Sequence, residues 1–152
     1  MDLILWRHAE AVEAEALDDL ARPLTAKGER HAERMAEWLN RRLAHSTRIL
    51  ASPALRCQQT AKALGRKFRT LDEIAPGAHP EALLLAARWP DASEPVLIVG
   101  HQPTLGMTAA LVLGGEAQPW TVKKAGVWWL RHRPRDDEGR VVLQAVQSPD
   151  LL

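Results

Sequence analysis

The sequence lacks the features that direct a protein out of the cell or into a membrane. It has a single cysteine, Cys57, and so can form no intramolecular disulfide. No apolar run approaches the roughly 20 residues that a membrane-spanning helix needs. The first residues also lack the basic start and long apolar stretch of a signal peptide. We therefore expect a cytoplasmic protein that does not associate with membranes.

An excess of charge of one sign is also missing. The chain carries 20 lysines and arginines against 19 aspartates and glutamates, a formal net charge of +1. Nucleic-acid binding usually requires a strongly basic face, so no nucleic-acid partner is expected. A local group of arginines could still bind a small anion. The sequence gives no indication of the oligomeric state.

Internal repeats, low-complexity blocks and linkers are absent, and the 152 residues fit one domain spanning 1–152. Short apolar runs alternate with longer segments of helical periodicity. Thr25 is a good N-cap, Ser52-Pro53 is a strong helix start, and Gly65 is a helix stop. Strands are expected at 3–6, 48–51, 69–71, 95–100, 127–130 and 141–146, with a hairpin over 134–140 joining the last two. Helices are expected at 26–44, 53–64, 81–89 and 102–113. This alternation predicts an α/β three-layer sandwich, with a mostly parallel central sheet flanked by helices.

Two histidines follow the two most apolar predicted strands. His8 comes directly after the first strand, with Arg7 beside it, and His101 follows the strand at 95–100. Arg56 lies in the first turn of the helix that follows the strand at 48–51. Ligands in such sheets bind beyond the carboxyl ends of the strands. We therefore expect two imidazoles and two guanidiniums around one crevice.

Such a group of side chains suits a tetrahedral anion. Guanidinium groups donate paired hydrogen bonds to phosphate oxygens, and a neutral imidazole is an accepted covalent nucleophile. A single histidine or arginine after a strand is more often structural or solvated. The four together favour a site for phosphoryl chemistry.

Several segments resemble the motifs of one known family, the histidine phosphatase superfamily, whose fold is phosphoglycerate mutase-like. The matching segments are 3–11 with Arg7-His8, 22–28 with Arg-Pro-Leu-Thr-Ala-Lys-Gly, 52–61 with Arg56, 99–103 with His101, and 148–151. The last of these and the short chain are similar to the SixA-like branch, the phosphohistidine phosphatases. The resemblance runs from residue 1 to the C-terminus.

The resemblance implies a role for each matching residue. His8 would be the nucleophile that becomes phosphorylated, and water would then hydrolyse the phosphohistidine intermediate. Arg7 and Arg56 would clamp the phosphoryl oxygens, and His101 would bind the same group. Arg22 could add another contact, although a surface arginine is the simpler interpretation. No metal or other cofactor is implied. The expected substrate is a phosphoprotein carrying phosphohistidine or a small phosphate compound.

The chain departs from the superfamily pattern at two places. Ala9 replaces the usual glycine, so the turn after His8 must use an ordinary backbone conformation. The region 71–80 lacks the signature of the acid that protonates an alcohol leaving group in the mutase and acid-phosphatase branches. Asp72 and Glu73 in that region are interpreted as solvated. Asp18 and Asp19 could touch substrate or orient Arg22, but solvation is favoured for them too. Cys57 is interpreted as a buried, inert thiol.

Four other functions compete with the phosphohistidine phosphatase. A small-molecule phosphate ester phosphatase would use the same residues. A non-catalytic phosphate-binding module would not need a nucleophilic imidazole. In a metal hydrolase His8, Glu10 and His101 would be ligands, but the arginines beside them oppose a dication. A phosphoglycerate mutase would need insertions and an acid that are not evident.

Overall fold

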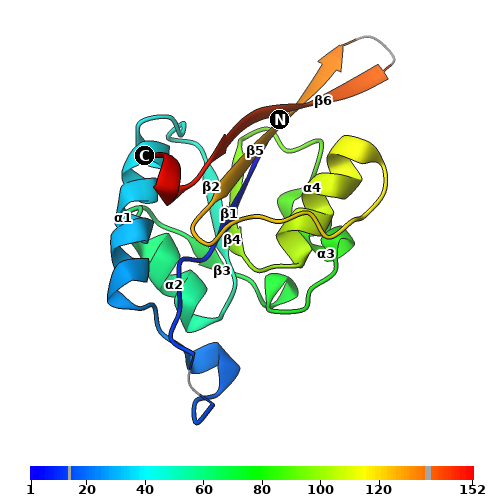
Figure 1. Ribbon diagram of the computed structural model, residues 1–152. Helices are drawn as coiled ribbons and strands as arrows, with labels where there is room; N and C mark the ends of the chain where they lie inside the picture. Colours follow the sequence, from blue (N-terminus) through cyan, green and yellow to red (C-terminus); the bar gives the residue numbers. More distant parts are fainter. Residues whose placement is uncertain (14, 136–137) are drawn as a thin grey trace.

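The computed structural model describes residues 1–13, 15–135 and 138–152 (Figure 1). The strands are β1 (Asp2–Arg7), β2 (Arg48–Ala51), β3 (Arg69–Thr70), β4 (Val96–Gly100), β5 (Val127–Arg135) and β6 (Glu138–Gln147). The helices are α1 (Ala26–Asn40), α2 (Leu55–Lys62), α3 (Pro80–Ala87) and α4 (Thr104–Gly114). Three short 3-10 helices are η1 (Asp19–Ala21), η2 (Asp72–Ile74) and η3 (Pro149–Leu151). Within the described residues, none of the helices is both long enough and apolar enough to span a bilayer.

All six strands form one sheet in the order β3-β2-β4-β1-β5-β6. The first four are mutually parallel, whereas β5 pairs antiparallel with β1 and β6 pairs antiparallel with β5. The register sets Arg7 opposite Gly100, so β1 and β4 end together and His8 and His101 emerge side by side. The predicted mostly parallel sheet is confirmed.

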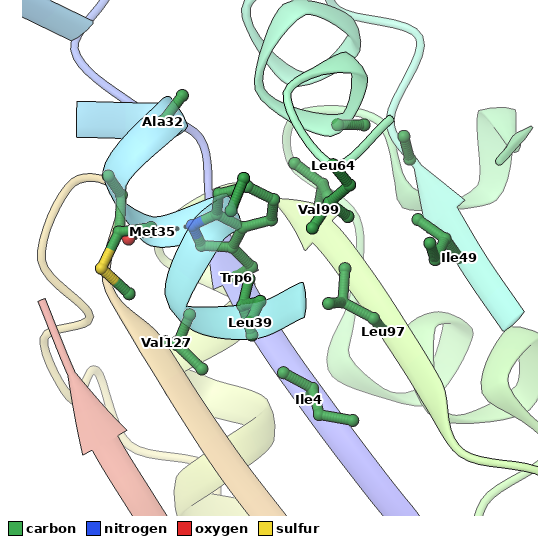
Figure 2. Packing of buried hydrophobic residues seen from close by; sticks show 14 of the residues in the cluster. Ile4, Trp6, Ala32, Met35, Leu39, Ile49, Leu64, Leu97, Val99 and Val127 are labelled. Atoms are coloured by element: carbon green, nitrogen blue, oxygen red, sulfur yellow. Dashed lines mark hydrogen bonds between the residues drawn. The ribbon is translucent and has the colours of Figure 1, made fainter. Parts of the chain in front are cut away.

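Helices cover both faces of the sheet, with α1 and α2 on one side and α3 and α4 on the other (Figure 1). Side chains of the central strands alternate between the two resulting cores. Ile4 and Trp6 of β1 point to the α1–α2 core, whereas Leu3 and Leu5 point to the α3–α4 core. Figure 2 shows Trp6 between the sheet and α1, near Met35. These two cores fix the positions of β1 and β4, the strands that precede His8 and His101.

Several element boundaries differ from those expected. The helix predicted to begin at Pro53 begins at Leu55, because Ser52 Oγ accepts a hydrogen bond from Ala54 N at 3.2 Å and the backbone of Ala54 stays extended. That helix ends at Lys62, and Gly65 has the positive φ of a helix stop, +67°. The helix after Thr25 ends at Asn40 instead of 44.

The remaining predicted elements also shift at their ends. The third helix ends at Ala87, where Arg88 adopts a left-handed conformation. The fourth helix covers Thr104–Gly114 rather than 102–113. The last two strands are longer than predicted and extend into the segment 134–140, whose residues 136–137 lie outside the described part of the chain. In Figure 1 this hairpin projects beyond the body of the sheet.

The segment after β1 is fixed to the start of α1. Thr25 is the N-cap of α1, and its Oγ1 accepts from Gly28 N at 2.9 Å, as predicted. The same hydroxyl donates to Glu10 Oε1 at 2.9 Å. A Cβ at Gly28 would lie 2.1 Å from Glu10 O, so this close approach requires glycine. The backbone that follows His8 is therefore held firmly in place.

Candidate active site

His8 is held by backbone contacts on both sides. Its N donates to Gly100 O of β4 at 3.1 Å, and its O accepts from Ala125 N at 3.1 Å. The ring Nδ1 lies 2.8 Å from Ala9 O, which can only accept, so Nδ1 carries the proton of the neutral ring. Nε2 then has the free lone pair that a nucleophile needs. Ala9 does not have a positive φ, so the expected ordinary turn after His8 is confirmed.

His101 lies against the His8 ring, with ring centroids 5.3 Å apart. Its Nε2 is 2.7 Å from Ser52 Oγ, the same oxygen that accepts from Ala54 N. The Nδ1 atom of the same ring faces Arg56 Nη2, which can only donate, at 3.4 Å. Ser52 therefore orients the His101 ring from one side and Arg56 contacts it from the other.

Three arginines meet the two histidines. Arg7 Nη1 donates to Val122 O at 2.9 Å. Arg56 is only 4% exposed, and its Nη1 and Nη2 donate to Asp19 O at 2.7 Å and Asp19 Oδ2 at 3.1 Å. The Nε atoms of both Arg7 and Arg56 are buried, and no hydrogen-bond partner is found for them among the described atoms. Arg48 Nη1, which does not line the site described below, is buried without a partner as well, so the two Nε atoms are compatible with a bound acceptor but do not identify one.

Arg22 reaches the same place from the loop after η1. Its Nε donates to Asp19 Oδ1 at 3.1 Å and its Nη1 to Val12 O at 3.1 Å. The two oxygens of the Asp19 carboxylate thus hold two different arginines, Arg22 and Arg56. The interpretation of Asp19 as merely solvated was wrong, because its side chain pairs with both.

A cavity of about 220 Å³ joins these side chains. The residues that line it are Arg7, His8, Ala11, Glu13, Arg22, Arg56, Pro76, His101, Gln102 and Lys124. The structure thus brings together all five residues singled out from the sequence. Four of the lining side chains are cationic, and Glu13 is the one carboxylate in this lining. A space of this size and charge suits a phosphate group and part of its leaving group.

Both imidazoles are kept neutral. Burial, assisted by the charges of Arg56 and Arg7 and opposed by the hydrogen bond to Ala9 O, lowers the pKa of His8 to about 4. Burial lowers the pKa of His101 to about 3, assisted by His8 and Arg56 and opposed by Asp19. A neutral His8 is the form that can attack phosphorus.

Sequence reasoning missed several residues near the cavity. Ser52 appeared only as a helix start, yet it contacts His101. Lys124 and Glu13 lie in segments without any recognisable motif. Asp72 is exposed in η2 and is not among the lining residues. Cys57 is buried as expected, and burial raises the pKa of its thiol to about 12.

Residues 3–83 match the sequence model of the histidine phosphatase superfamily (branch 1). The chain belongs to the histidine phosphatase superfamily. Among curated relatives of this superfamily member is the phosphohistidine phosphatase SixA of Escherichia coli. The two are 30% identical over 127 residues, which is 78% of each chain.

Solved structures agree with this membership. A structure of the protein histidine phosphatase SixA complexed with tungstate has a TM-score of 0.78 and 26% identity, covering 99% of both chains. A structure from Agrobacterium tumefaciens, provisionally assigned as phosphohistidine phosphatase SixA, has a TM-score of 0.81 and 28% identity, covering 97% of both chains. The predicted phosphoglycerate mutase-like α/β fold is confirmed. The protein is a phosphatase of the SixA-like kind.

Proposed function

We propose that this phosphatase hydrolyses phosphohistidine on a protein through a covalent phosphoryl intermediate on His8. The observation that carries the proposal is the hydrogen bond from His8 Nδ1 to Ala9 O, which leaves Nε2 unprotonated in a ring already kept neutral by burial. The whole chain, 1–152, would act as one cytoplasmic domain.

In the first step His8 Nε2 attacks phosphorus, a new P–N bond forms, and the bond from phosphorus to the leaving nitrogen breaks. The leaving imidazole keeps the electron pair of that bond and takes a proton from solvent water, while His8 keeps its Nδ1 proton and becomes a phosphorylated imidazolium. Arg7, Arg56 and His101, which line the cavity together, would hold the equatorial oxygens. Arg22 would add charge at the rim of the same cavity.

In the second step a water molecule attacks the phosphoryl group on His8. The P–N bond to His8 breaks, inorganic phosphate forms, and the ring returns to its neutral form. The same oxyanion donors serve both steps, because the equatorial oxygens occupy the same positions in each. No metal or cofactor enters this scheme.

The leaving group favours a phosphoramidate over an ester. An imidazole departs more readily than an alkoxide and needs less help from a general acid. The acid signature of the mutase branch is missing from region 71–80, and its two carboxylates, Asp72 and Glu73, are exposed. The relatives named SixA are phosphohistidine phosphatases, which supports the same substrate here.

The test compares a phosphohistidine peptide with a panel of small phosphate esters by kcat/KM. We expect the peptide to be preferred, and His8→Ala to abolish turnover of both while circular dichroism shows a retained fold. Preference for an ester would favour the small-molecule phosphatase instead. Phosphate binding without any turnover by the unmodified protein would favour a non-catalytic module.

A metal hydrolase has weaker support. Among the described residues, no three histidine, cysteine, aspartate or glutamate side chains are grouped to hold a metal ion. The neighbours of His8 and His101 are guanidiniums, which disfavour a dication. We expect full activity in excess chelator. If chelator abolished activity and a divalent ion restored it, the metal hydrolase would be favoured instead.

A further inference from the structure

Among the residues that the structure describes, the Asp19 carboxylate is the one side-chain anion that forms ion pairs with two of the cavity arginines. Arg56 Nη2 donates to Oδ2 at 3.1 Å, and Arg22 Nε donates to Oδ1 at 3.1 Å. The Asp19 carbonyl oxygen also accepts from Arg56 Nη1 at 2.7 Å. Arg56 therefore directs both terminal nitrogens to one residue, which lies 37 positions away in the chain.

These contacts fix the plane of the Arg56 guanidinium. With Nη1 and Nη2 both held, the direction of the Nε–H bond is determined as well. That N–H is buried and has no partner within the described part of the molecule. The other contact of Nη2 is His101 Nδ1 at 3.4 Å. Asp19 thus fixes the Arg56 guanidinium with its Nη2 beside the ring of His101.

The exposed fractions of the Arg56 and Asp19 side chains indicate which of the two residues the ion pair stabilises. The Arg56 side chain is 5% exposed, whereas the Asp19 side chain is 56% exposed. An exposed carboxylate gains little from an ion pair, but a buried guanidinium needs a partner to offset its lost solvation. The pair therefore stabilises the position of Arg56 more than it stabilises Asp19.

The charges around the cavity lead to the same conclusion. Arg7, Arg22, Arg56 and Lys124 are opposed by Glu13 and Asp19, which leaves two positive charges when both histidines are neutral. A phosphate dianion balances these two charges. Asp19 therefore keeps Arg22 and Arg56 close together while the cavity retains a net positive charge.

We propose that Asp19 is a positioning residue that orients Arg56, and with it Arg22, for transition-state binding of the phosphoryl group. The proposal rests on the proposed function of the same site. Asp19 itself touches neither the phosphoryl group nor the leaving group. It acts by fixing the orientation of the Arg56 guanidinium in the lining of the cavity, beside His101.

The test compares Asp19→Ala with Asp18→Ala, its neighbour in the same exposed segment. Asp18 makes no side-chain cap to η1, and its backbone contact to Ala21 N survives the change. We expect Asp19→Ala to lower kcat by about tenfold to a hundredfold with a smaller change in KM, because misplaced donors act mainly on the transition state. Asp18→Ala should match the unmodified protein.

Two further measurements separate positioning from a structural role. Asp19→Asn keeps the shape and one acceptor, so its kcat should lie between those of Asp19→Ala and the unmodified protein. Inhibition by orthovanadate, a mimic of the transition state, should weaken in Asp19→Ala by about the factor by which kcat/KM falls. In an Arg56→Ala background, Asp19→Ala should lower kcat by a clearly smaller factor than it does with Arg56 present, because only the contact with Arg22 remains.

Each contrary result has a definite meaning. An Asp19→Ala variant as active as the unmodified protein would overturn the proposal. So would a faster variant, because the carboxylate would then compete with phosphate. The same fold-loss with and without Arg56 would indicate a general structural effect and also overturn it. A different result would contradict the proposed function: His8→Ala or Arg56→Ala would leave turnover intact.

Discussion

The two buried histidines should make the protein lose stability between pH 7 and pH 5. The pKa of His8 falls from 6.5 to about 4 on folding, and that of His101 falls from 6.5 to about 3. Both values lie below the unfolded value, so the unfolded chain takes up protons first as the pH falls. The stability from the neutral rings is complete above pH 6.5 and declines toward the folded values.

The expected loss of folding stability depends on how far the pH lies below 6.5, the pKa of an unfolded histidine. At pH 5 both rings of the folded protein are still neutral, while each unfolded histidine is protonated. The difference of about 1.5 pH units corresponds to about 2 kcal/mol for each histidine. Carboxylates contribute little in this window, because their unfolded pKa values lie near 4. We therefore expect a loss of about 4 kcal/mol from the pair.

Urea unfolding at pH 7 and pH 5 measures this loss. His101→Asn should remove about 2 kcal/mol of it, and the double variant with His8→Asn should remove most of it. Cys57→Ala is the control, because it alters a buried neighbour of His101 but leaves both imidazoles in place. If His101→Asn and the control show the same loss between the two pH values, the account of neutral, buried rings is refuted.

Three other outcomes can be checked with simple assays. The value of kcat/KM should fall at acid pH with a midpoint near 4, because protonation of His8 removes its lone pair; a midpoint at 6.5 would contradict burial of the ring. Gly106→Ala should lower the unfolding free energy by about 1–3 kcal/mol, because its Cβ would lie 1.6 Å from Trp120 O, whereas Gly114→Ala meets no atom within 4 Å and should not destabilise. Cys57 should resist iodoacetamide at pH 8 until urea unfolds the chain, because burial raises its pKa to about 12; rapid labelling of the folded protein would contradict this.

Sequence reasoning could predict the parts of the site that depend on buried parallel strands. His8 and His101 each follow a strand of continuous apolar residues, and the paired strand ends bring them together. Arg56 was predictable because it lies one turn into a helix that follows a third parallel strand. In each case the strand pattern alone determines the edge of the sheet at which the residue lies.

The residues that sequence reasoning missed depend on loop geometry. Orientation of Arg22 by Asp19 was considered from the sequence but solvation was favoured, and only the folded loop shows that the carboxylate meets both Arg22 and Arg56. Ser52 was interpreted as a helix cap from its position before Pro53. Its hydroxyl accepts from Ala54 N at the helix start and also contacts His101, which comes 49 residues later in the chain. Local propensity cannot reveal such long-range polar contacts.

Trapping of the phosphoryl group on His8 tests the central claim most directly. The enzyme would be mixed with a phosphohistidine peptide, quenched in alkali within milliseconds to preserve the P–N bond, and examined by peptide mass spectrometry. The account predicts one phosphoryl group on the peptide that contains His8, formed and lost at rates compatible with turnover and absent from His8→Ala. Turnover with the phosphoryl group on another residue, or on none, would contradict it.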